Sequence, residues 1–293
     1  MKSTTVRSPK VLVLPGIENL ASIAKEFSPE WSIVGGRFRD ITFKFDNGKT
    51  EICFKGKDLR KYEYIWLSSG WDDRDLAYAI SLYLSELKIP HTPVEKAGSK
   101  IVDQVLFTMH GIPTPVTCFT TRRSAGVAFR LVRECCGFPA IVKDIYGARG
   151  RYSKMIENRT GLESVFKKLK PGRRFMFQRF VPNEYDWGVL VVNGEVKSAE
   201  KSYRADGEFR NNACRKAKEI FIPVGDVPDD VKEIAIKAAE LLGLSWSRSD
   251  IIVNKETGEP LLLEVNRFPG ITFGSGEIVA ASEYLKGRLA EVK

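Results

Sequence analysis

The chain of 293 residues is long enough for two domains, and its composition excludes several classes of protein. Hydrophobic residues make up 43% and charged residues 28%, with no low-complexity tract, which indicates a folded globular protein rather than a disordered or fibrous one. No apolar run approaches the roughly 20 residues of a membrane helix, and the polar start MKSTTVRSPK lacks the apolar centre of a signal peptide. We therefore expect a cytoplasmic protein without a membrane partner.

The cysteines and the net charge indicate which metal sites, disulfides and binding partners to expect. The cysteines are odd in number and lack the paired spacing of a zinc site, so we expect reduced, mostly buried thiols at Cys53, Cys118, Cys135, Cys136 and Cys214. The net charge of +9 favours an acidic partner such as a nucleotide, a nucleic acid or an acidic peptide. Charge alone does not choose among these partners.

The N-terminal third alternates between strand and helix patterns. Residues 11–14 (VLVL) predict a buried strand, which is followed by helical periodicity up to Phe27. The run ITFKFDNGKTEICF alternates on either side of a turn at residues 46–48, which predicts a β-hairpin. A strand in YEYIWLSSG and a helix over residues 72–87 complete a small α/β domain.

Helix caps organise the next part of the chain. Ser99 is a predicted N-cap, and the helix after it carries its apolar residues on one face at Ile101, Val105, Leu106 and Met109. A second helix is predicted over residues 124–136, before Gly137. Thr160 and Glu163 have the spacing of a capping box, which predicts a third helix.

Strands dominate the rest of the pattern. FPAIVKDIYGARGRYSKMI carries two β-like runs on either side of a glycine-rich turn. RFMFQRF, WGVLVVNGEVKSA and EIFIP predict further strands, with a hairpin turn at Asn193 and Gly194. An amphipathic helix is predicted over residues 230–242, and two last strands bracket NKETGEP.

The last predicted strand, PLLLEVN, holds two polar residues that are costly to bury without partners, Glu264 and Asn266. Successive side chains of a strand point to opposite faces. Regular alternation therefore places Leu262 on the same face as Glu264 and Asn266, and the opposite face carries Leu261, Leu263 and Val265.

A carboxylate pair is predicted at this strand. If residues 250–266 fold as a hairpin that turns near Thr257, Asp250 lies opposite Glu264 on the neighbouring strand. Two facing carboxylates repel each other unless a cation lies between them, and hard oxygen ligands suit Mg²⁺ held jointly with a nucleotide. Spacing alone leaves open an alternative in which the acidic side chains point to solvent.

Several segments in order resemble the ATP-grasp superfamily and, among its branches, the ligases of the RimK type, which join an amino acid to a carboxylate. The segments are PAIVKDIYGARG, FMFQRFVPNEYDWGVLVVNGEV, GEFRNN and SDIIVNKETGEPLLLEVNRFPG. The resemblance implies an α/β (α+β) fold in which a small N-terminal α/β (pre-ATP-grasp) domain, residues 1–97, precedes an ATP-grasp domain, residues 98–293. The latter would comprise a central subdomain (98–174) and a C-terminal subdomain (175–293).

The resemblance also implies contacts to the phosphates of ATP. Lys143 matches a lysine that reaches the phosphates from a strand, and Lys100 matches a second one at a helix start, where a phosphate would compensate the unfavourable helix dipole. Gly147 and Gly150 match a flexible loop in which glycine lets backbone N–H groups approach the anion. Taken one by one, these residues also fit exposed lysines and a plain hairpin turn.

The adenosine part of ATP is matched by two features. The segment FQRFV resembles the link between the two ATP-grasp subdomains, whose backbone pairs with the adenine edge while apolar side chains sandwich the ring; it contains Gln178, Arg179, Phe180 and Val181. Asp186 matches an acidic residue near the ribose, with a surface loop as the alternative.

The candidate catalytic residues are Lys143 and Arg210. Arg210, in GEFRNN, matches an arginine that contacts the transferred phosphate and stabilises the developing oxyanion, with Asn212 as a helper. The ligands of the Mg²⁺ ion, or alternatively Mn²⁺, that would bind with ATP match Asp250, Glu264 and Asn266.

Two departures from the family pattern lie near the expected acceptor site. After Asp186 relatives usually carry a nearby arginine, but this chain has Trp187 and Gly188. After Asn212 the chain continues with ACRKAKEI, where glutamate ligases have a glycine pair. The nucleotide-binding residues match, whereas the identity of the substrate stays open.

The resemblance implies an ATP-dependent carboxylate–amine ligase that forms an amide or peptide bond through an acyl phosphate and releases ADP and phosphate. The substrate would be an amino acid or a peptide, and family analogy suggests a homo-oligomer. The positive charge would either attract an acidic peptide or protein tail or serve only as a solubilising surface. Alternatives are a small-molecule kinase of the same fold and a non-catalytic nucleotide- or nucleic-acid-binding protein. Nucleic acid is disfavoured because binding alone does not require metal ligands beside a phosphate-binding lysine.

Overall fold

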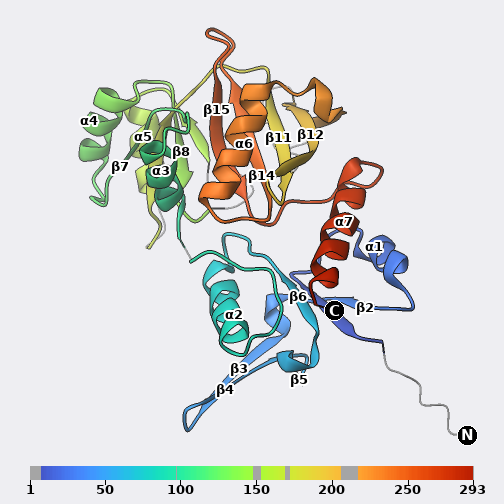
Figure 1. Cartoon of the computed structure of the whole chain (residues 1–293). Helices are drawn as coiled ribbons and strands as arrows, with labels where there is room; N and C mark the ends of the chain where they lie inside the picture. Colours follow the sequence, from blue (N-terminus) through green and yellow to red (C-terminus); the bar gives the residue numbers. More distant parts are fainter. Residues whose placement is uncertain (1–7, 97, 148–152, 169–171, 206–216, 293) are drawn as a thin grey trace, which may run out of the picture. The chain divides into compact units, whose positions relative to one another are not determined.

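The computed structural model describes residues 8–96, 98–147, 153–168, 172–205 and 217–292 (Figure 1). The chain divides into two compact units. The terminal unit comprises residues 1–97 together with 267–293, and the central unit comprises residues 98–266. The domain limits predicted from the sequence, which assign residues 267–293 to the ATP-grasp domain, stay a prediction.

The terminal unit contains a parallel sheet in which β1 (Lys10–Leu14) lies between β2 (Ser32–Gly35) and β6 (Tyr64–Leu67). Strands β1 and β6 are almost wholly apolar because a parallel sheet is covered on both faces. Helices α1 (Leu20–Phe27) and α2 (Arg74–Glu86) follow β1 and β6 in the chain, as the sequence predicts.

A β-hairpin and a C-terminal helix complete this unit. Strand β3 (Ile41–Asp46) pairs with β4 (Lys49–Phe54) across the predicted turn, and β5 (Lys57–Asp58) pairs with β4. Helix α7 (Gly276–Ala290) is not among the predicted helices. Its buried side chains include Glu277 beside alanines and leucines, so no apolar stripe of helical period marks it in the sequence.

One sheet of the central unit carries two helices on one face. Its strand order is β7–β10–β8–β9, with bounds Thr117–Phe119, Phe175–Arg179, Ala140–Asp144 and Lys154–Ile156. Helices α4 (Ala125–Cys135) and α5 (Arg159–Lys167) contribute Val132 and Leu162 to a core that also holds Val142 of β8 and Phe177 of β10. Neighbours of these strand residues therefore point to the opposite face.

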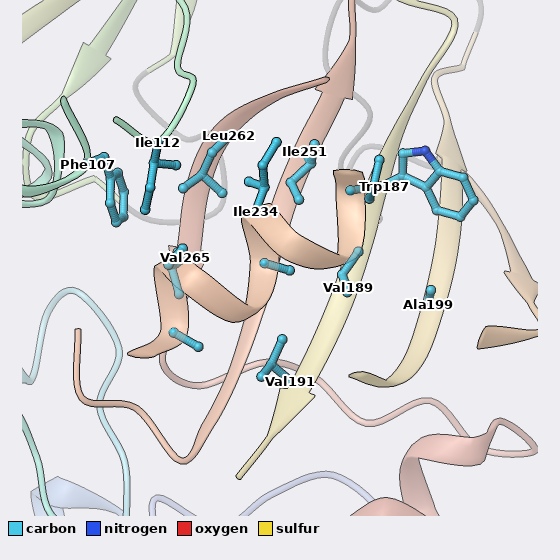
Figure 2. Close-up of a cluster of buried hydrophobic side chains, with 14 of the residues drawn as sticks. Phe107, Ile112, Trp187, Val189, Val191, Ala199, Ile234, Ile251, Leu262 and Val265 are labelled. Atoms are coloured by element: carbon cyan, nitrogen blue, oxygen red, sulfur yellow. The ribbon is translucent and has the colours of Figure 1, made fainter. Parts of the chain in front are cut away.

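The second sheet of the central unit is antiparallel and is covered by α6 (Asp229–Leu241) (Figure 1). Its strand order is β13–β12–β11–β14–β15, with bounds Lys218–Ile222, Glu195–Tyr203, Tyr185–Val192, Trp246–Val253 and Pro260–Asn266. Figure 2 shows Val189, Ile251, Leu262 and Val265 from three strands facing Ile234 of α6. Burial of each such side chain contributes about 1.5–3 kcal/mol to folding.

Phe107 and Ile112 join the same core from the α3 region (Figure 2). Helix α3 spans Lys100–Met109 and begins at the predicted cap, because the Ser99 side chain accepts a hydrogen bond from the Ile101 backbone N–H. The predicted apolar face of α3 is wrong: the side of the helix that meets the sheet carries Phe107, while Val105 is 50% exposed and Met109 77% exposed.

The described residues contain no helix with the length and hydrophobicity needed to span a bilayer. Short 3₁₀ helices lie at Phe38–Asp40, Leu59–Lys61 and Val224–Asp226.

The cap of α5 differs from the predicted one. The helix begins two residues earlier than predicted, and Asn158, not Thr160, is the N-cap: its Oδ1 accepts a hydrogen bond from the Gly161 backbone N–H at 3.0 Å. Asparagine is as good a cap as serine, but the Thr160–Glu163 pair that follows has the spacing of a capping box and favours Thr160 for that reason.

The change Asn158→Ala is expected to lower the free energy of unfolding by about 1 kcal/mol, because an N–H of the first turn loses its acceptor. Thr160→Ala is the matched control and should change it by less than half as much. Urea unfolding of the full chain measures both. A larger loss for Thr160→Ala would restore the predicted capping box.

Candidate active site

A row of charged residues crosses the antiparallel sheet on the face opposite α6. The register pairs Asp250 of β14 with Glu264 of β15, so the hairpin and the facing carboxylates predicted from the sequence are confirmed. In the other direction Asp250 pairs with Gly188 of β11, and Gly188 pairs with Glu200 of β12. One register row therefore brings three carboxylates to the same face of the sheet.

A β-bulge in β15 sets the direction of Glu264. Asp250 pairs with Glu264 and the next residue, Ile251, pairs with Leu262, which leaves Leu263 as the extra residue. Leu262 packs under α6 with Val265, so the predicted common face of Leu262 and Glu264 is wrong. The bulge reverses the alternation and lets the strand bury Leu262 while Glu264 faces the charged row.

Asp250 is held by its neighbours in an unfavourable charge environment. Asn266 donates through Nδ2 to both carboxylate oxygens of Asp250, at 3.2 and 3.1 Å. The pKa of Asp250 is raised to about 7, by burial first and by Glu264 and Asp186 next, while Arg248 and the Asn266 hydrogen bond act in the opposite direction. The net effect of burial and of the neighbouring carboxylates is therefore to disfavour the ionised form of Asp250.

Two lysines bring positive charge to this row from other elements. Lys100, the first residue of α3, lies with Nζ 2.5 Å from Oε2 of Glu264. The Lys100 backbone N–H donates to the carbonyl of Ile145, just beyond β8, which ties the start of α3 to that strand. The predicted dipole penalty at this helix start is thus offset by a carboxylate of the opposite sheet.

Lys143 reaches the site from β8. Val142 points into the helix-covered core, so Lys143 points to the other face, where its Nζ donates to Oε1 of Gln178 at 2.7 Å. The pKa of Lys143 is lowered to about 8, by burial first and by Lys100 next, whereas Glu264, Asp186 and Asp250 act in the opposite direction. An added anion such as a phosphate would favour the charged form of this lysine.

The side chains of residues 178–181, the predicted adenine-binding segment, are buried or half-buried, or form hydrogen bonds within the protein. Gln178 is buried, accepts from Lys143 and donates through Nε2 to Oγ1 of Thr117 at 3.1 Å. Arg179 donates through Nε to the Cys136 carbonyl at 2.9 Å and so binds the end of α4. Phe180 is half-buried and Val181 is buried. The predicted contacts of this segment to adenine rest on its backbone and stay a prediction.

The remaining predicted residues are placed as follows. Asp186 accepts a hydrogen bond from Nδ2 of Asn183 at 2.7 Å. Gly147 donates its N–H to the carbonyl of Asp144, and a Cβ atom on Gly147 would lie 3.0 Å from that of Asp144, so a side chain there would need Asp144 to shift. Gly150, Arg210 and Asn212 lie outside the described residues.

A buried ion pair in the row of charged residues on the antiparallel sheet is not among the features predicted from the sequence. Arg248 of β14 lies with Nη1 3.2 Å from Oε1 of Glu200 on β12, and their side chains are only 12% and 4% exposed. The pair crosses β11 above Gly188: a Cβ atom there would lie 3.3 Å from Cδ of Arg248 and would clash with the Glu200 carboxylate. Strand alternation was the available signal, since Arg248 is two residues before Asp250.

The donor set fits a divalent cation by its chemistry. Among the residues that the structure describes, no three His, Cys, Asp or Glu side chains form a metal cluster by themselves. The predicted set supplies two carboxylates and one carboxamide, which are hard oxygen donors of the kind that Mg²⁺ takes together with phosphate oxygens. A cation there would also relieve the repulsion that raises the pKa of Asp250.

The sequence has relatives among known proteins. A probable alpha-L-glutamate ligase of Desulfotalea psychrophila is 28% identical over 247 residues, which are 81% of this chain and 52% of that protein. Another, of Parasynechococcus marenigrum, is 32% identical over 182 residues, 61% of this chain and 38% of that protein. This chain thus matches about half or less of the length of these relatives.

The fold has counterparts among solved structures. D-alanyl-alanine synthetase A of Vibrio cholerae superposes with a TM-score of 0.71 over 98% of each chain, at 15% sequence identity. This likeness confirms the predicted α/β ATP-grasp fold. The model of the RimK-like ATP-grasp domain matches residues 97–282, about two thirds of the chain. The chain therefore belongs to the RimK-like ATP-grasp family.

Proposed function

We propose that the protein is an ATP-dependent ligase that joins a carboxylate to an amine. The observation that carries the proposal is the pair of facing carboxylates, Asp250 and Glu264, met by Lys100 and Lys143 within a RimK-like ATP-grasp domain. An arrangement of hard anionic ligands beside two ammonium groups is suited to a metal-bound polyphosphate.

The chemistry proposed for this site has two steps. A substrate carboxylate attacks the γ-phosphate of ATP, which gives an acyl phosphate and ADP; an amine then attacks the acyl carbon, and phosphate leaves. Lys143 and Lys100 would offset the charge of the phosphates, and Arg210 would stabilise the oxyanion of the second step. Asp250, Glu264 and Asn266 would hold Mg²⁺, which supplies charge neutralisation on the phosphates.

Glu200 and Arg248 are proposed to line the acceptor side. They occupy the same sheet face as the metal residues, on the strands that pair with Gly188 of β11. A buried pair of opposite charges complements a substrate that carries both an amine and a carboxylate. This supports an amino acid or a peptide end as the substrate, in line with the glutamate ligases among the relatives.

An acidic peptide is proposed as the larger partner. Arginines surround a shallow pocket where β7 ends and β10 begins, together with Phe166 and Phe175; they are Arg122, Arg123, Arg173 and Arg174. Arg173 is committed to the fold through an ion pair of 2.7 Å with Asp144. Arg122 and Arg174 are exposed, so they are positioned to attract carboxylates of a partner.

Glu264→Ala is expected to reduce phosphate release from Mg-ATP by about 100-fold or more, because a proposed metal ligand and the partner of Lys100 are lost together. The assay supplies the common amino acids and a few acidic peptides. Glu259→Ala, an exposed glutamate at the preceding turn, is the matched control and should retain activity.

The product distinguishes the reaction classes in this assay. An amide found by mass spectrometry together with free phosphate supports ligation, whereas a product that keeps the phosphate identifies a kinase. Unchanged turnover in Glu264→Ala would refute the metal assignment.

Asp250→Asn is expected to stabilise the protein in EDTA by a few degrees, because it removes one of two repelling carboxylates; about 1 kcal/mol shifts the melting temperature by about 2–4 °C in a chain of this size. The same variant should lose the extra stability that Mg²⁺ gives the wild type. Asp226→Asn, an exposed aspartate, serves as control. An undiminished magnesium effect in Asp250→Asn would show that the ion binds elsewhere.

Arg122→Glu combined with Arg174→Glu is expected to raise the KM for an acidic peptide by roughly tenfold, equivalent to about 1.4 kcal/mol, and to flatten its dependence on salt. Turnover of a free amino acid should be unaffected, because neither arginine belongs to the charged row. Arg130→Glu combined with Arg133→Glu on α4 makes a control of equal charge change outside the pocket. Equal effects of the control pair and the pocket pair would assign the result to net charge alone.

A further inference from the structure

Two thiols meet inside the helix-covered sheet of the central unit. Cys118 lies on β7, and Cys136 follows the last turn of α4; their Sγ atoms are 3.5 Å apart and both side chains are buried. The position follows from the sequence: Ala128, Val132 and Cys136 are four residues apart on α4 and share the face that meets the sheet. The fold thus places the two thiols side by side, although the proposed ligation reaction uses neither of them.

The thiols of the pair differ in character. The pKa of Cys136 is lowered, first by its hydrogen bond with Cys118 and further by Arg179, against the effect of burial. The pKa of Cys118 is raised by the same hydrogen bond and by burial. Cys136 also approaches the backbone carbonyls of Val116 at 3.6 Å and Phe177 at 3.5 Å. Cys136 is therefore the better nucleophile of the two.

Among the cysteines that the structure describes, Cys118 is the one placed to pair with Cys136. Cys135 is exposed, but adjacent Cα atoms are about 3.8 Å apart, which is below the usual range for a disulfide. Cys53 is buried in the terminal unit, on β4. Cys135 is instead a site that an oxidant can reach from solvent, because its side chain is exposed. It is also close enough to Cys118 to contribute to the raised pKa of Cys118.

We propose that Cys118 and Cys136 form an oxidative modification site, at which a peroxide produces a reversible disulfide. A thiolate takes the terminal oxygen of hydrogen peroxide, which yields a sulfenic acid and hydroxide; the second thiol attacks that sulfur, the S–S bond forms and water leaves. The two sulfurs are oxidised and the peroxide is reduced to two waters. If Cys135 is oxidised first, the Cys118 thiol attacks its sulfenic sulfur, water leaves and a Cys118–Cys135 bond forms; the Cys136 thiolate then attacks Cys118 and releases the Cys135 thiol.

The bond would act on the segment that is proposed to contact adenine. Closing the sulfur separation from 3.5 Å to about 2.0 Å draws the end of α4 toward β7. Arg179 holds that end through the Cys136 carbonyl, and Phe177, opposite Cys118 in the register, is two residues before it. The oxidised protein should therefore bind ATP more weakly by at least about fivefold, the lower end of common couplings between sites.

The experiment exposes the full chain to hydrogen peroxide, unfolds it, blocks the remaining thiols with N-ethylmaleimide and maps peptides by mass spectrometry without reduction. The expected result is a cross-linked peptide that joins Cys118 to Cys136 and disappears with dithiothreitol, while Cys53 is alkylated. Cys53→Ser is the matched control, a buried thiol whose loss should leave the cross-link unchanged. Cys118→Ser should abolish it, and Cys135→Ser should slow its formation.

ATP affinity of oxidised and re-reduced protein completes the test, with oxidised Cys118→Ser expected to bind ATP as its reduced form does. Because the peptide map is made on the wild type, it does not depend on how the variants fold. The proposal is overturned if Cys118 and Cys136 are both alkylated at peroxide levels that oxidise Cys135, or if either is joined to another cysteine. A cross-link with unchanged ATP affinity overturns the coupling to the nucleotide segment.

Discussion

The repulsion between Asp250 and Glu264 is the constraint on which the central unit depends. Hydrogen bonding across the β14–β15 ladder fixes both carboxylates on one face, so neither can turn away without loss of register. Positive charge has to come from elsewhere, and it arrives on α3 through Lys100, on β8 through Lys143 and on β14 through Arg248. Residues distant in the sequence are therefore brought together by charge as well as by apolar packing.

Each sheet of the central unit has an apolar face, which packs against helices, and a polar face, which carries the site. This separation explains why the sheet tolerates a row of charged residues. The opposite face of the same strands is filled by Val189, Ile251 and Val265 beneath α6, and this packing, not the charged row, stabilises the sheet. In the other sheet Val142 and Phe177 do the same beneath α4 and α5, which leaves Lys143 and Gln178 for the site. Fold and site thus use alternate residues of the same strands.

Local patterns predicted most elements and the central register, because a two-residue period in 250–266 allows one hairpin that pairs Asp250 with Glu264. The face of Leu262 was predicted wrongly because a bulge inserts one residue, and nothing in a run of leucines marks it. Helix α7 lacks an apolar stripe, and Arg248 was overlooked because its partner Glu200 is on a strand that pairs with β11 rather than β14. Only the last of these errors concerns a contact between strands that are distant in sequence, which periodicity does not encode.

Gly188 limits which substitutions proteins of this kind can accept on this face of the sheet. The space above it is filled by Arg248 and Glu200, so a side chain at position 188 would compete with this ion pair for the same volume. Replacing either arrangement one residue at a time passes through an intermediate with a clash or an uncompensated buried charge, each costly by several kcal/mol. Positions 188, 200 and 248 are therefore expected to change as a set, and a new acceptor preference would arise in a concerted step rather than by gradual adjustment.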